Sequence, residues 1–452
     1  MRLTGMDVWR RRTTGRLLVL GLAGNLLLLW SSSAAGWYAY SEQYAKWQES
    51  RPLTMAAWHS AVARDRVPER IARYKASGLN QIFFLKLPRA CDWGWVQAAR
   101  EAGLEWMGGM RGGPPKAAVQ QAMEIGGGSA VIVFDEPGDR PEDYAAIRER
   151  IAWVHDTYPG LLAYANLSIT KINIERYITE CKPDVFSYDQ YPLYRNGETF
   201  VEYLYYLNVA RETARRHRLP FWMILQAYGR EHERPTYAYR VPGEADARFL
   251  AFTLLAHGGN GMQFFTYYGF RESMIAIPYE SAQEEALMRY EESAPTACYF
   301  AMQDMAPEIQ QLGRALLRLR TKDEIGYAGA VPRKCSAFQG HGALKAVSIL
   351  EDQEAPVLVS FFDDRAGEEY FMVVNLTHGK DLTKGEGQRT VRLVFENVES
   401  VERLNRLTGA IDLLHTNPSA GNTCTLDIVL PGGTGDLFKW HNGKPWDIRP
   451  QP

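Results

Sequence analysis

Eight short apolar segments alternate with amphipathic helical stretches between about residue 53 and residue 270, and this repeat constrains the fold most strongly. Each apolar segment is followed by Gly, Pro or polar residues and then by a helical pattern, which is the order of a strand and its crossover helix. Eight such units predict a (β/α)8 TIM barrel within residues 50–320. A doubly wound sheet is disfavoured, because no glycine-rich phosphate loop follows the first segment. The predicted strands are Leu53–Trp58, Gln81–Leu87, Leu104–Met107, Ala130–Phe134, Leu161–Ala165, Val185–Tyr191, Phe221–Gln226 and Gly261–Tyr267.

The chain changes character after the barrel. Residues Ser281–Leu317 are predicted to be mostly helical and to pack on the barrel wall. From about Lys322, apolar and polar residues alternate in short segments separated by Asn, Gly and Asp, which is typical of antiparallel strands. We therefore predict a C-terminal antiparallel β-sandwich over residues 322–445, serving as a structural support or a binding appendage. Its clearest strands are Val357–Phe362, Tyr370–Asn375, Arg389–Phe395 and Cys424–Leu430.

Residues 1–35 have the layout of a secretory signal peptide. An arginine cluster, Arg10–Arg12, precedes an apolar run, Leu17–Trp30, and Ser33 and Ala35 offer small residues at a cleavage site. The apolar run is shorter than a comfortable membrane span. We therefore expect an exported protein, periplasmic or extracellular, that meets a membrane only if this segment stays uncleaved as an anchor.

Composition excludes several classes of protein. The sequence has 51 Lys and Arg against 53 Asp and Glu, so its near-zero net charge gives no argument for nucleic acid or an anionic membrane as a partner. Its five cysteines lie far apart, which disfavours a zinc site or a disulfide-rich scaffold, although one pair could bridge. The HExxH, CxxC, P-loop and GxSxG motifs do not occur in the sequence, so no metal or other cofactor is expected.

The predicted fourth strand ends in two adjacent carboxylates. Its apolar residues Val131–Phe134 suit a strand that is covered on both faces, and Asp135, Glu136 and Pro137 follow at once. In this fold the chemistry takes place at the C-terminal ends of the strands. Asp135 and Glu136 are therefore the first candidates for catalytic residues.

Other predicted strand ends supply aromatic, amide and charged side chains. Aromatic rings stack on the C–H faces of sugars, and fixed polar groups bind sugar hydroxyls, so this mixture predicts a carbohydrate ligand. For His59 a structural role is the favoured alternative, and for Lys86 an ion pair with Asp135 or Asp189 is an equally good interpretation. The candidate substrate-binding residues are Trp58, His59, Lys86, Asn166, Tyr188, Tyr191, Gln226, Tyr228 and Tyr267.

Glycoside cleavage needs an acid that protonates the leaving oxygen and a second group across the anomeric carbon. We expect Glu136 to be the acid, because a neighbouring carboxylate and aromatic cover favour its protonated form. Two interpretations of the second group stay open. Either Asp135 orients a 2-acetamido group whose oxygen attacks the anomeric carbon, or Asp189 acts as nucleophile or base from the sixth strand. A carboxylate on the seventh strand is excluded, since that strand ends in Gln226.

The motif Phe134–Pro137, followed by a helix ending in His155–Pro159 and by the segment Pro183–Asp189, resembles the barrel of glycoside hydrolase family 123. The resemblance covers the barrel from the fourth strand onward. It implies a β-N-acetylgalactosaminidase-like reaction in which Asp135 orients the acetamido group and Glu136 is the acid and base. The large N-terminal sandwich of that family is missing here, and the eighth strand offers Phe and Tyr in place of a tryptophan-rich wall.

The leading hypothesis is therefore an exported, retaining, substrate-assisted N-acetylhexosaminidase. Two alternatives remain. One is a two-carboxylate glycosidase in which Glu136 works with Asp189 on a glycan without an acetamido group. The other is a glycan-binding barrel protein without catalytic activity.

Overall fold

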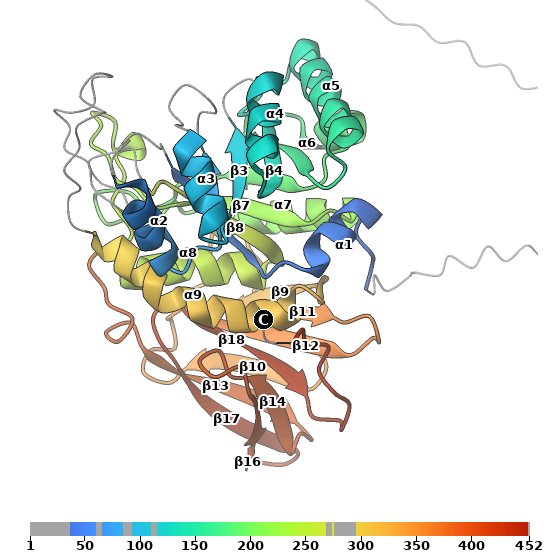
Figure 1. Cartoon of the computed structure of the whole chain (residues 1–452). Coiled ribbons are helices and arrows are strands. Elements are labelled where there is room, and N and C mark those ends of the chain that lie inside the picture. Colours follow the sequence, from blue (N-terminus) through green and yellow to red (C-terminus); the bar gives the residue numbers. More distant parts are fainter. Residues whose placement is uncertain are drawn as a thin grey trace, which may run out of the picture. The chain divides into compact units, whose positions relative to one another are not determined.

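The structure is a computed structural model that describes residues 37–59, 66–84, 93–109, 115–267, 274 and 295–450 (Figure 1). The predicted signal segment and Lys86 lie outside the described residues, so what was predicted for them stays a prediction. The chain from Ala35 onward clusters as one compact unit. Within the described ranges, no helix is both long and apolar enough to cross a membrane.

The eight predicted strands form one closed, parallel barrel. They pair in sequence order, and β1 closes the barrel against β8 with Thr54 beside Gly261. The predicted (β/α)8 fold is thus confirmed. The strands are β1 (Thr54–His59), β2 (Gln81–Phe84), β3 (Glu105–Gly109), β4 (Gly128–Asp135), β5 (Leu162–Leu167), β6 (Phe186–Asp189), β7 (Phe221–Gln226) and β8 (Gly259–Phe265).

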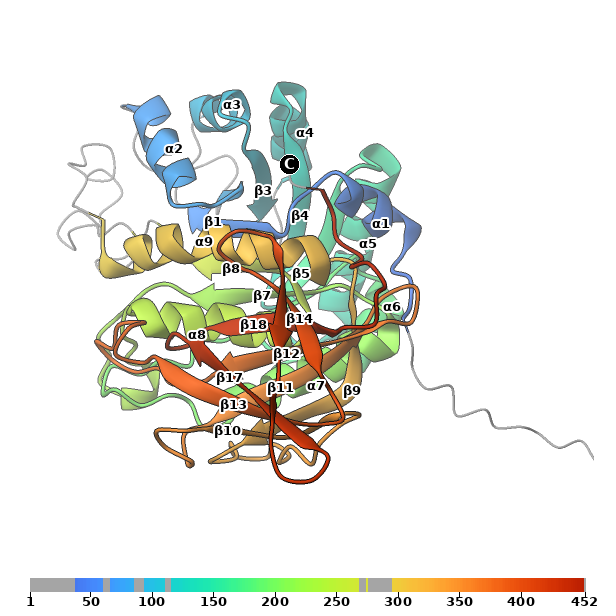
Figure 2. The same cartoon turned by 90° about the horizontal axis from the view of Figure 1, so that it is seen from below.

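Helices follow the strands and cover the outside of the barrel (Figures 1 and 2). In α5, for example, Ile147, Ile151 and Val154 are buried at helical spacing, so that one face packs on the sheet. A 3-10 turn, Pro235–Tyr237, lies in the loop after β7. The helices are α2 (Val67–Ala76), α3 (Trp93–Glu101), α4 (Lys116–Ile125), α5 (Pro141–Thr157), α6 (Ile174–Cys181), α7 (Tyr203–His217), α8 (Glu244–Ala256) and α9 (Ala297–Leu316).

A short helix that the sequence analysis missed, α1 (Glu42–Glu49), closes the N-terminal end of the barrel. Its Tyr44 and Trp47 belong to the hydrophobic cluster of the barrel interior. The Trp47 ring lies 5.5 Å from the ring of Trp222, and Trp47 Nε1 donates to the Ser129 carbonyl at 2.9 Å. Because Ser129 and Trp222 lie near the starts of their strands, α1 fills this end and leaves the C-terminal strand ends for a site.

The C-terminal part is the predicted antiparallel sandwich. One sheet has the order β15-β14-β18-β12-β11-β9 and the other β10-β13-β17-β16. Phe361, Phe371, Phe395 and Phe438 lie in the hydrophobic core between them. The strands are β9 (Arg320–Ala328), β10 (Leu344–Ile349), β11 (Val357–Asp363), β12 (Glu369–Asn375), β13 (Arg389–Glu396), β14 (Ser400–Leu404), β15 (Ile411–His415), β16 (Asn417–Pro418), β17 (Thr423–Leu430) and β18 (Gly435–Trp440).

A buried network of charged side chains joins the barrel helices to the sandwich. Arg248 of α8 is fully buried, and its guanidinium donates to Glu308 of α9 at 2.7 Å and to the Thr434 hydroxyl at 3.2 Å. Glu308 also accepts from Arg406 at 2.8 Å, and Arg406 pairs with Asp436 of β18. Each of these buried charges therefore has an opposite charge or a hydrogen-bond partner, as burial requires.

His155 of α5 and Asp184 connect a barrel helix to strand β5. Both residues lie in the motifs that resemble family 123. His155 Nε2 lies 2.8 Å from Asp184 Oδ2, and the same oxygen accepts from the Ala163 backbone N–H of β5 at 2.7 Å. The hydrogen bond to Asp184 raises the pKa of His155, and partial burial opposes that rise. Because the folded-state pKa lies above the unfolded value, the interaction stabilises the fold below about pH 6.5. That stabilisation is lost as the pH rises through the folded-state pKa.

Replacing His155 with glutamine is expected to remove this pH dependence. Melting temperatures measured from about pH 5.5 to about pH 8.5 at constant ionic strength should show the variant less stable than wild type at the acidic end. The difference should shrink as the pH rises. The substitution His232→Gln, in an exposed loop, is the control and should leave the profile unchanged. Parallel profiles for wild type and His155→Gln would contradict the assigned interaction.

Candidate active site

An irregularity in β4 determines the direction of its last side chain, that of Asp135. Ile132 faces the barrel interior, so strict alternation would turn Phe134 inward next. The register shifts between Ile132 and Phe134, and Asp135 consequently pairs with Asn166 of β5. This β-bulge inserts one residue and places Asp135, instead of Phe134, on the inner face at the mouth of the barrel.

The amide of Asn166 joins two carboxylates. Asn166 is buried, and its Nδ2 donates to Asp135 Oδ1 at 3.0 Å and to Asp189 Oδ1 at 3.1 Å. Asp189 is the last residue of β6, so three adjacent strands contribute to one cluster. Both carboxylate oxygens accept from the same nitrogen, so the distance between the two oxygens cannot exceed the sum of the two hydrogen-bond lengths. The structure thus brings together three residues that the sequence analysis selected.

The surroundings of Asp189 favour its protonated form. Burial raises the pKa of Asp189 to about 7, and the negative charges of Glu136 and Asp135 contribute to that rise. The hydrogen bond from Asn166 and the ammonium group of Lys171 oppose it. Near neutral pH a large fraction of Asp189 therefore carries a proton. From the sequence, we had predicted the protonated carboxyl group to be that of Glu136 instead.

Glu136 adopts a left-handed backbone conformation, with φ +47°, which is uncommon for a residue other than glycine. Its backbone N–H donates to the Asn166 carbonyl at 2.9 Å, and its side chain is 40% exposed. Lys171 Nζ lies 3.2 Å from Glu136 Oε2. The charge of Glu136 acts on Asp189 and on Tyr191, so it belongs to the same site. We call Asp135, Glu136 and Asp189 the carboxylate cluster.

Four aromatic side chains lie beside the carboxylate cluster. Tyr191 stacks on Phe265 with ring centres 5.8 Å apart, and Tyr228 meets the Tyr191 ring edge-on at 5.2 Å. Tyr239 contacts both tyrosines. Burial raises the pKa of Tyr191 and of Tyr228, and the charges of Asp189 and Glu136 contribute. We call Tyr191, Tyr228, Tyr239 and Phe265 the aromatic wall.

Trp58 lies inside the barrel, beneath the aromatic wall. Its ring stacks on Phe83 at 4.2 Å and meets the edge of Phe265 at 5.5 Å. Its Nε1 donates to Gln263 Oε1 at 2.9 Å, and Gln263 Nε2 donates to the Tyr164 hydroxyl at 2.6 Å. The predicted contact of Trp58 with substrate is therefore corrected to a packing role, because the ring is buried and its N–H is occupied.

Three predicted substrate-binding residues, His59, Tyr188 and Tyr267, point out of the barrel into the helix layer. His59 packs against Trp95 at 4.5 Å and stacks on Tyr267 at 5.5 Å, and burial lowers the pKa of His59 to about 3. Tyr188 stacks on Phe221 at 5.8 Å. The prediction is corrected for all three. Alternation along β1 and β6 puts His59 and Tyr188 on the face opposite the site. Tyr267 lies two residues beyond the end of β8, and its ring packs on Tyr74 of α2 at 4.7 Å. His59 takes the structural role named as its alternative.

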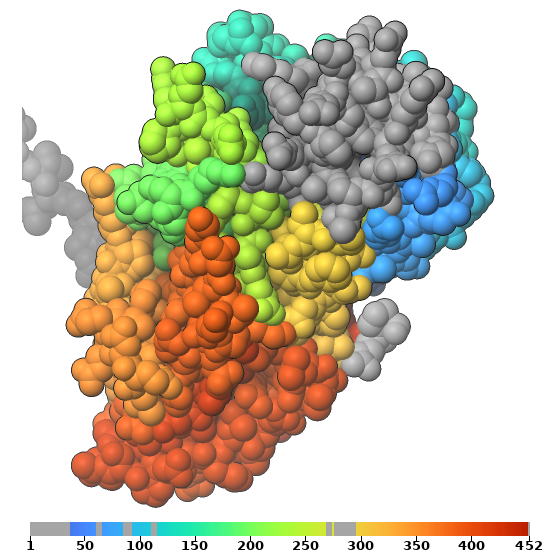
Figure 3. All heavy atoms as spheres, turned by 90° about the vertical axis from the view of Figure 1, so that its left-hand side faces the viewer, coloured from blue at the N-terminus to red at the C-terminus, as the bar shows by residue number. Residues whose placement is uncertain are grey.

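Gln226 joins two loops instead of binding substrate. Its Oε1 accepts from the Leu193 N–H at 2.9 Å, and its Nε2 donates to the carbonyls of Leu193 and Arg240 at 3.0 and 2.7 Å. The predicted role is corrected, because backbone groups form hydrogen bonds with both the Oε1 and the Nε2 atom of Gln226. The loops after β6 and β7, green and yellow-green, project side by side at the surface (Figure 3). These loops carry Tyr191 and Tyr239, so Gln226 positions the aromatic wall.

Lys171 and Tyr239 belong to the site but were not predicted from the sequence. Both residues lie within loops, several residues beyond the end of a strand. Side chains do not alternate regularly in a loop, so the sequence does not indicate where these two point. Lys171 lies in the loop after β5. The one available signal for it was that the loops after the strands of a predicted barrel surround the site. The predicted substrate contact of Lys86 falls outside the described residues.

The described part of the chain offers neither a metal site nor a disulfide. No group of three His, Cys, Asp or Glu side chains there could hold a metal ion. Four of the cysteines are described, and each is a free thiol, so the disulfide that the sequence left open does not form among them. They are Cys181, Cys298, Cys335 and Cys424.

Comparisons with known proteins found similarity at the level of structure. No family model matches the sequence, and no curated protein matches it. The chain is similar to a GH27 β-L-arabinopyranosidase from Geobacillus stearothermophilus, with 9% identity over 88% of this chain and 99% of that one, at a TM-score of 0.44. It is also similar to a glycoside hydrolase family 5 protein from Bacteroides vulgatus, with 11% identity over 86% and 89%, at a TM-score of 0.42. A family 30 subfamily 8 xylanase from Clostridium acetobutylicum shows 10% identity over 86% and 95%, at a TM-score of 0.39.

Proposed function

We propose that this protein is a glycoside hydrolase that cleaves a glycosidic bond at the carboxylate cluster. The single observation behind the proposal is the Asn166 amide that bridges Asp135 and Asp189 at the mouth of the barrel. Two carboxyl groups held on either side of a sugar ring are what cleavage at an anomeric carbon requires. The neighbouring aromatic wall offers faces on which a sugar ring can stack. The proposed substrate is therefore a carbohydrate.

Asp189 is assigned the role of proton donor. Its pKa of about 7 keeps a proton available near neutral pH, and this proton passes to the glycosidic oxygen as the C–O bond breaks. Asp135 is assigned the role of nucleophile, whose oxygen forms a bond to the anomeric carbon. Water, deprotonated by Asp189, then attacks the same carbon and releases the sugar.

The shared amide favours a retaining reaction. Retaining glycosidases hold their carboxyl groups about 5 to 5.5 Å apart, and inverting enzymes hold them about 6.5 to 9.5 Å apart to admit a water. Asp135 and Asp189 are drawn together by hydrogen bonds of 3.0 and 3.1 Å to one nitrogen. Glu136 and Lys171, at the more exposed rim, are assigned to sugar hydroxyls.

An N-acetylhexosaminidase is the second candidate, and the backbone at Glu136 favours it. Its φ of +47° departs from strand geometry, and as a result adjacent Asp135 and Glu136 both act on Asp189 instead of facing opposite sides. In this reaction Asp135 would orient the 2-acetamido group whose oxygen attacks the anomeric carbon, and Glu136 would protonate the leaving oxygen. The resemblance to family 123 supports this candidate.

A panel of aryl glycosides tests the proposed function. The panel includes N-acetylgalactosaminide and N-acetylglucosaminide beside neutral and acidic sugars, and release of the aryl alcohol is measured. Turnover of at least one member is expected. A glycan-binding barrel without activity would bind glycans, measured by calorimetry, while releasing no aryl alcohol from any member, and that result would overturn the proposal.

The substitution Glu136→Gln separates the two candidates. If Asp189 is the donor, this variant should lose about tenfold or less in kcat/KM, mainly through KM, because one hydroxyl contact is weakened. A loss of at least about 10³-fold, confined to N-acetyl substrates, would favour the second candidate. Glu142→Gln, an exposed carboxylate in the first turn of α5, is the matched control.

We also propose that the protein is exported, on the signal-like layout of residues 1–35. Expression of the full chain and of a chain that begins at residue 36, followed by cell fractionation, tests this. Export of both forms, or of neither, would contradict the proposed signal.

A further inference from the structure

The register of three neighbouring strands places the side chain of Asn166 between the two aspartates of the carboxylate cluster. Asn166 of β5 pairs with Asp135 of β4 on one side and with Ser187 of β6 on the other. Asp189 follows Ser187 by two residues, so both lie on the same face of β6. Asn166 is 2% exposed. A buried amide therefore separates a carboxylate on each neighbouring strand.

The neighbours of this amide determine which of its ends faces the carboxylates. An ionised carboxylate only accepts hydrogen bonds, whereas an amide NH2 group has two hydrogens to donate. Asn166 Nδ2 donates to Asp135 Oδ1 at 3.0 Å and to Asp189 Oδ1 at 3.1 Å. The other end, Oδ1, accepts from the hydroxyl of the fully buried Ser187 at 3.4 Å. Turning the amide over would bring its oxygen against a carboxylate oxygen, which is repulsive.

Charged groups from two elements act on Asp189. Asp135 and Glu136, at the end of β4, have the same sign of charge, and Lys171, in the loop after β5, has the opposite sign. Lys171 is 59% exposed, so its charge is screened by solvent. Of the two influences that lower the pKa of Asp189, the hydrogen bond from Asn166 is larger than the charge of Lys171. The other titratable neighbours are tyrosines that burial keeps neutral, namely Tyr188, Tyr191, Tyr228 and Tyr239.

We propose that Asn166 is a positioning residue that holds Asp135 and Asp189 in place and sets the upper pH limit of hydrolysis. This inference rests on the proposed glycosidase function. Donation to Asp135 favours the ionised form that attacks the anomeric carbon. Donation to Asp189 limits how tightly that residue holds its proton, so that the proton can pass to the glycosidic oxygen. One buried amide thus acts on the nucleophile and on the proton donor together.

Replacing Asn166 with leucine, which has a similar size and no polar side-chain atom, tests this role. The ionised form of Asp189 loses a donor, so the pKa of Asp189 should rise above about 7. The decline of kcat/KM at high pH should therefore move to higher pH by about 1 unit. At the pH optimum of the wild type, kcat/KM should fall about 10- to 100-fold, because Asp135 also loses a hydrogen bond. Initial rates with a glycoside of a poor leaving group, from about pH 5 to about pH 10, measure both effects.

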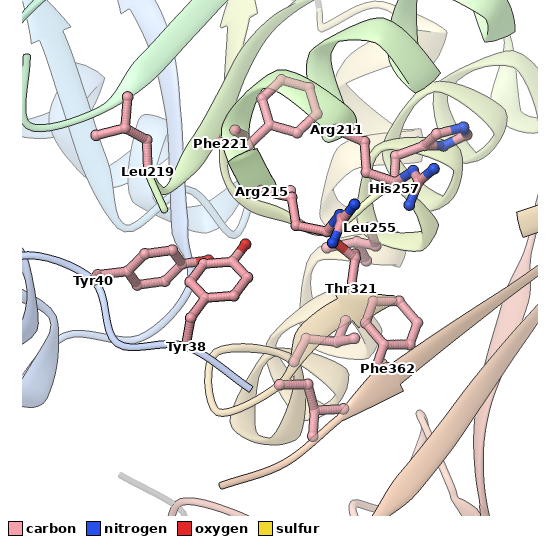
Figure 4. Close-up of a pocket in the computed structure, with 15 residues that line it drawn as sticks. Tyr38, Tyr40, Arg211, Arg215, Leu219, Phe221, Leu255, His257, Thr321 and Phe362 are labelled. Atoms are coloured by element: carbon pink, nitrogen blue, oxygen red, sulfur yellow. The ribbon is translucent and has the colours of Figure 1, made fainter. Parts of the chain in front are cut away.

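Asn260→Leu is the matched control. Asn260 is 3% exposed, and its side-chain oxygen accepts from the Tyr40 hydroxyl at 2.9 Å and from the Phe221 backbone N–H at 3.2 Å. Tyr40 and Phe221 line a pocket at the end of the barrel where β7 begins, opposite the carboxylate cluster (Figure 4). This variant should lose stability and keep the wild-type pH profile. A decline at unchanged pH in Asn166→Leu would show a merely structural role and overturn the proposal.

A crystal structure of the unaltered protein at about pH 9, where both aspartates are ionised, provides a measurement that depends neither on activity nor on the folding of a variant. Hydrogen bonds from Asn166 Nδ2 to both Asp135 and Asp189 would support the proposal. A hydrogen bond to only one of them would overturn it. If the wild type cleaves no glycoside, the proposed function fails, and this structure still decides whether Asn166 holds the two aspartates.

Discussion

Replacing Asp189 with asparagine is expected to lower kcat/KM by at least about 10³-fold for glycosides with poor leaving groups, because the proton donor is lost. Glycosides of dinitrophenol, whose leaving group departs without protonation, should lose far less. The pKa of Asp189 is about 7, so the wild-type rate with poor leaving groups should fall as the pH rises through this value. The variant should lack that decline. Initial rates from about pH 5 to about pH 9 with both substrate types measure the effect.

Stability provides the control for this substitution. The folded-state pKa of Asp189 exceeds its ordinary value of 3.8, so the group destabilises the fold increasingly as the pH rises from that value to about 7. Asp189→Asn should therefore melt at the same temperature as wild type, or higher, at neutral pH. Glu142→Gln should leave rate and Tm unchanged. Undiminished turnover of poor leaving groups by Asp189→Asn would contradict the assignment and leave Glu136 as the donor.

The barrel could be predicted because its signals are local and repeated. Strand four was predicted at Ala130–Phe134 and extends from Gly128 to Asp135, an error confined to the ends. Helix α1 was missed although Ser41 caps it and Glu42 pairs with Lys46, because a helix of eight residues is too short to show a helical pattern clearly. It is stabilised by tertiary contacts, chiefly those of Tyr44 and Trp47 inside the barrel, and a sequence pattern does not record such contacts.

The sequence predicts which chain positions lie at the site, but it does not predict the direction in which each side chain points. Tyr188 and Asp189 are adjacent at the end of β6, yet Tyr188 faces the helices and Asp189 faces the site. A period-two pattern decides such cases only where the strand is regular. The bulge before Phe134 reverses the alternation in β4, and no residue in that apolar run marks it. The inward position of Asp135 therefore had to come from the structure.

A second large effect is expected at Asp135. The substitution Asp135→Asn should lower kcat/KM by at least about 10⁴-fold for every leaving group, dinitrophenol included, because no carboxylate remains to bond the anomeric carbon. This uniform loss distinguishes a nucleophile from the proton donor Asp189, whose replacement is partly offset by a good leaving group. Asparagine preserves the shape of the side chain and its hydrogen bond with Asn166, so Tm should change little.

Covalent trapping distinguishes a nucleophile from a residue that orients an acetamido group. A 2-deoxy-2-fluoro glycoside with a good leaving group should inactivate the wild-type enzyme, and mass spectrometry of the digested protein should locate the sugar on Asp135. Glu142→Gln should be labelled like wild type, and Asp135→Asn should not be labelled. In the substrate-assisted reaction the sugar never bonds to the protein, because the acetamido oxygen takes the place of the carboxylate. Turnover restricted to N-acetyl substrates, with no labelling under any condition, would therefore replace the two-aspartate mechanism with the second candidate, and a label on Glu136 would reassign the nucleophile within the same cluster.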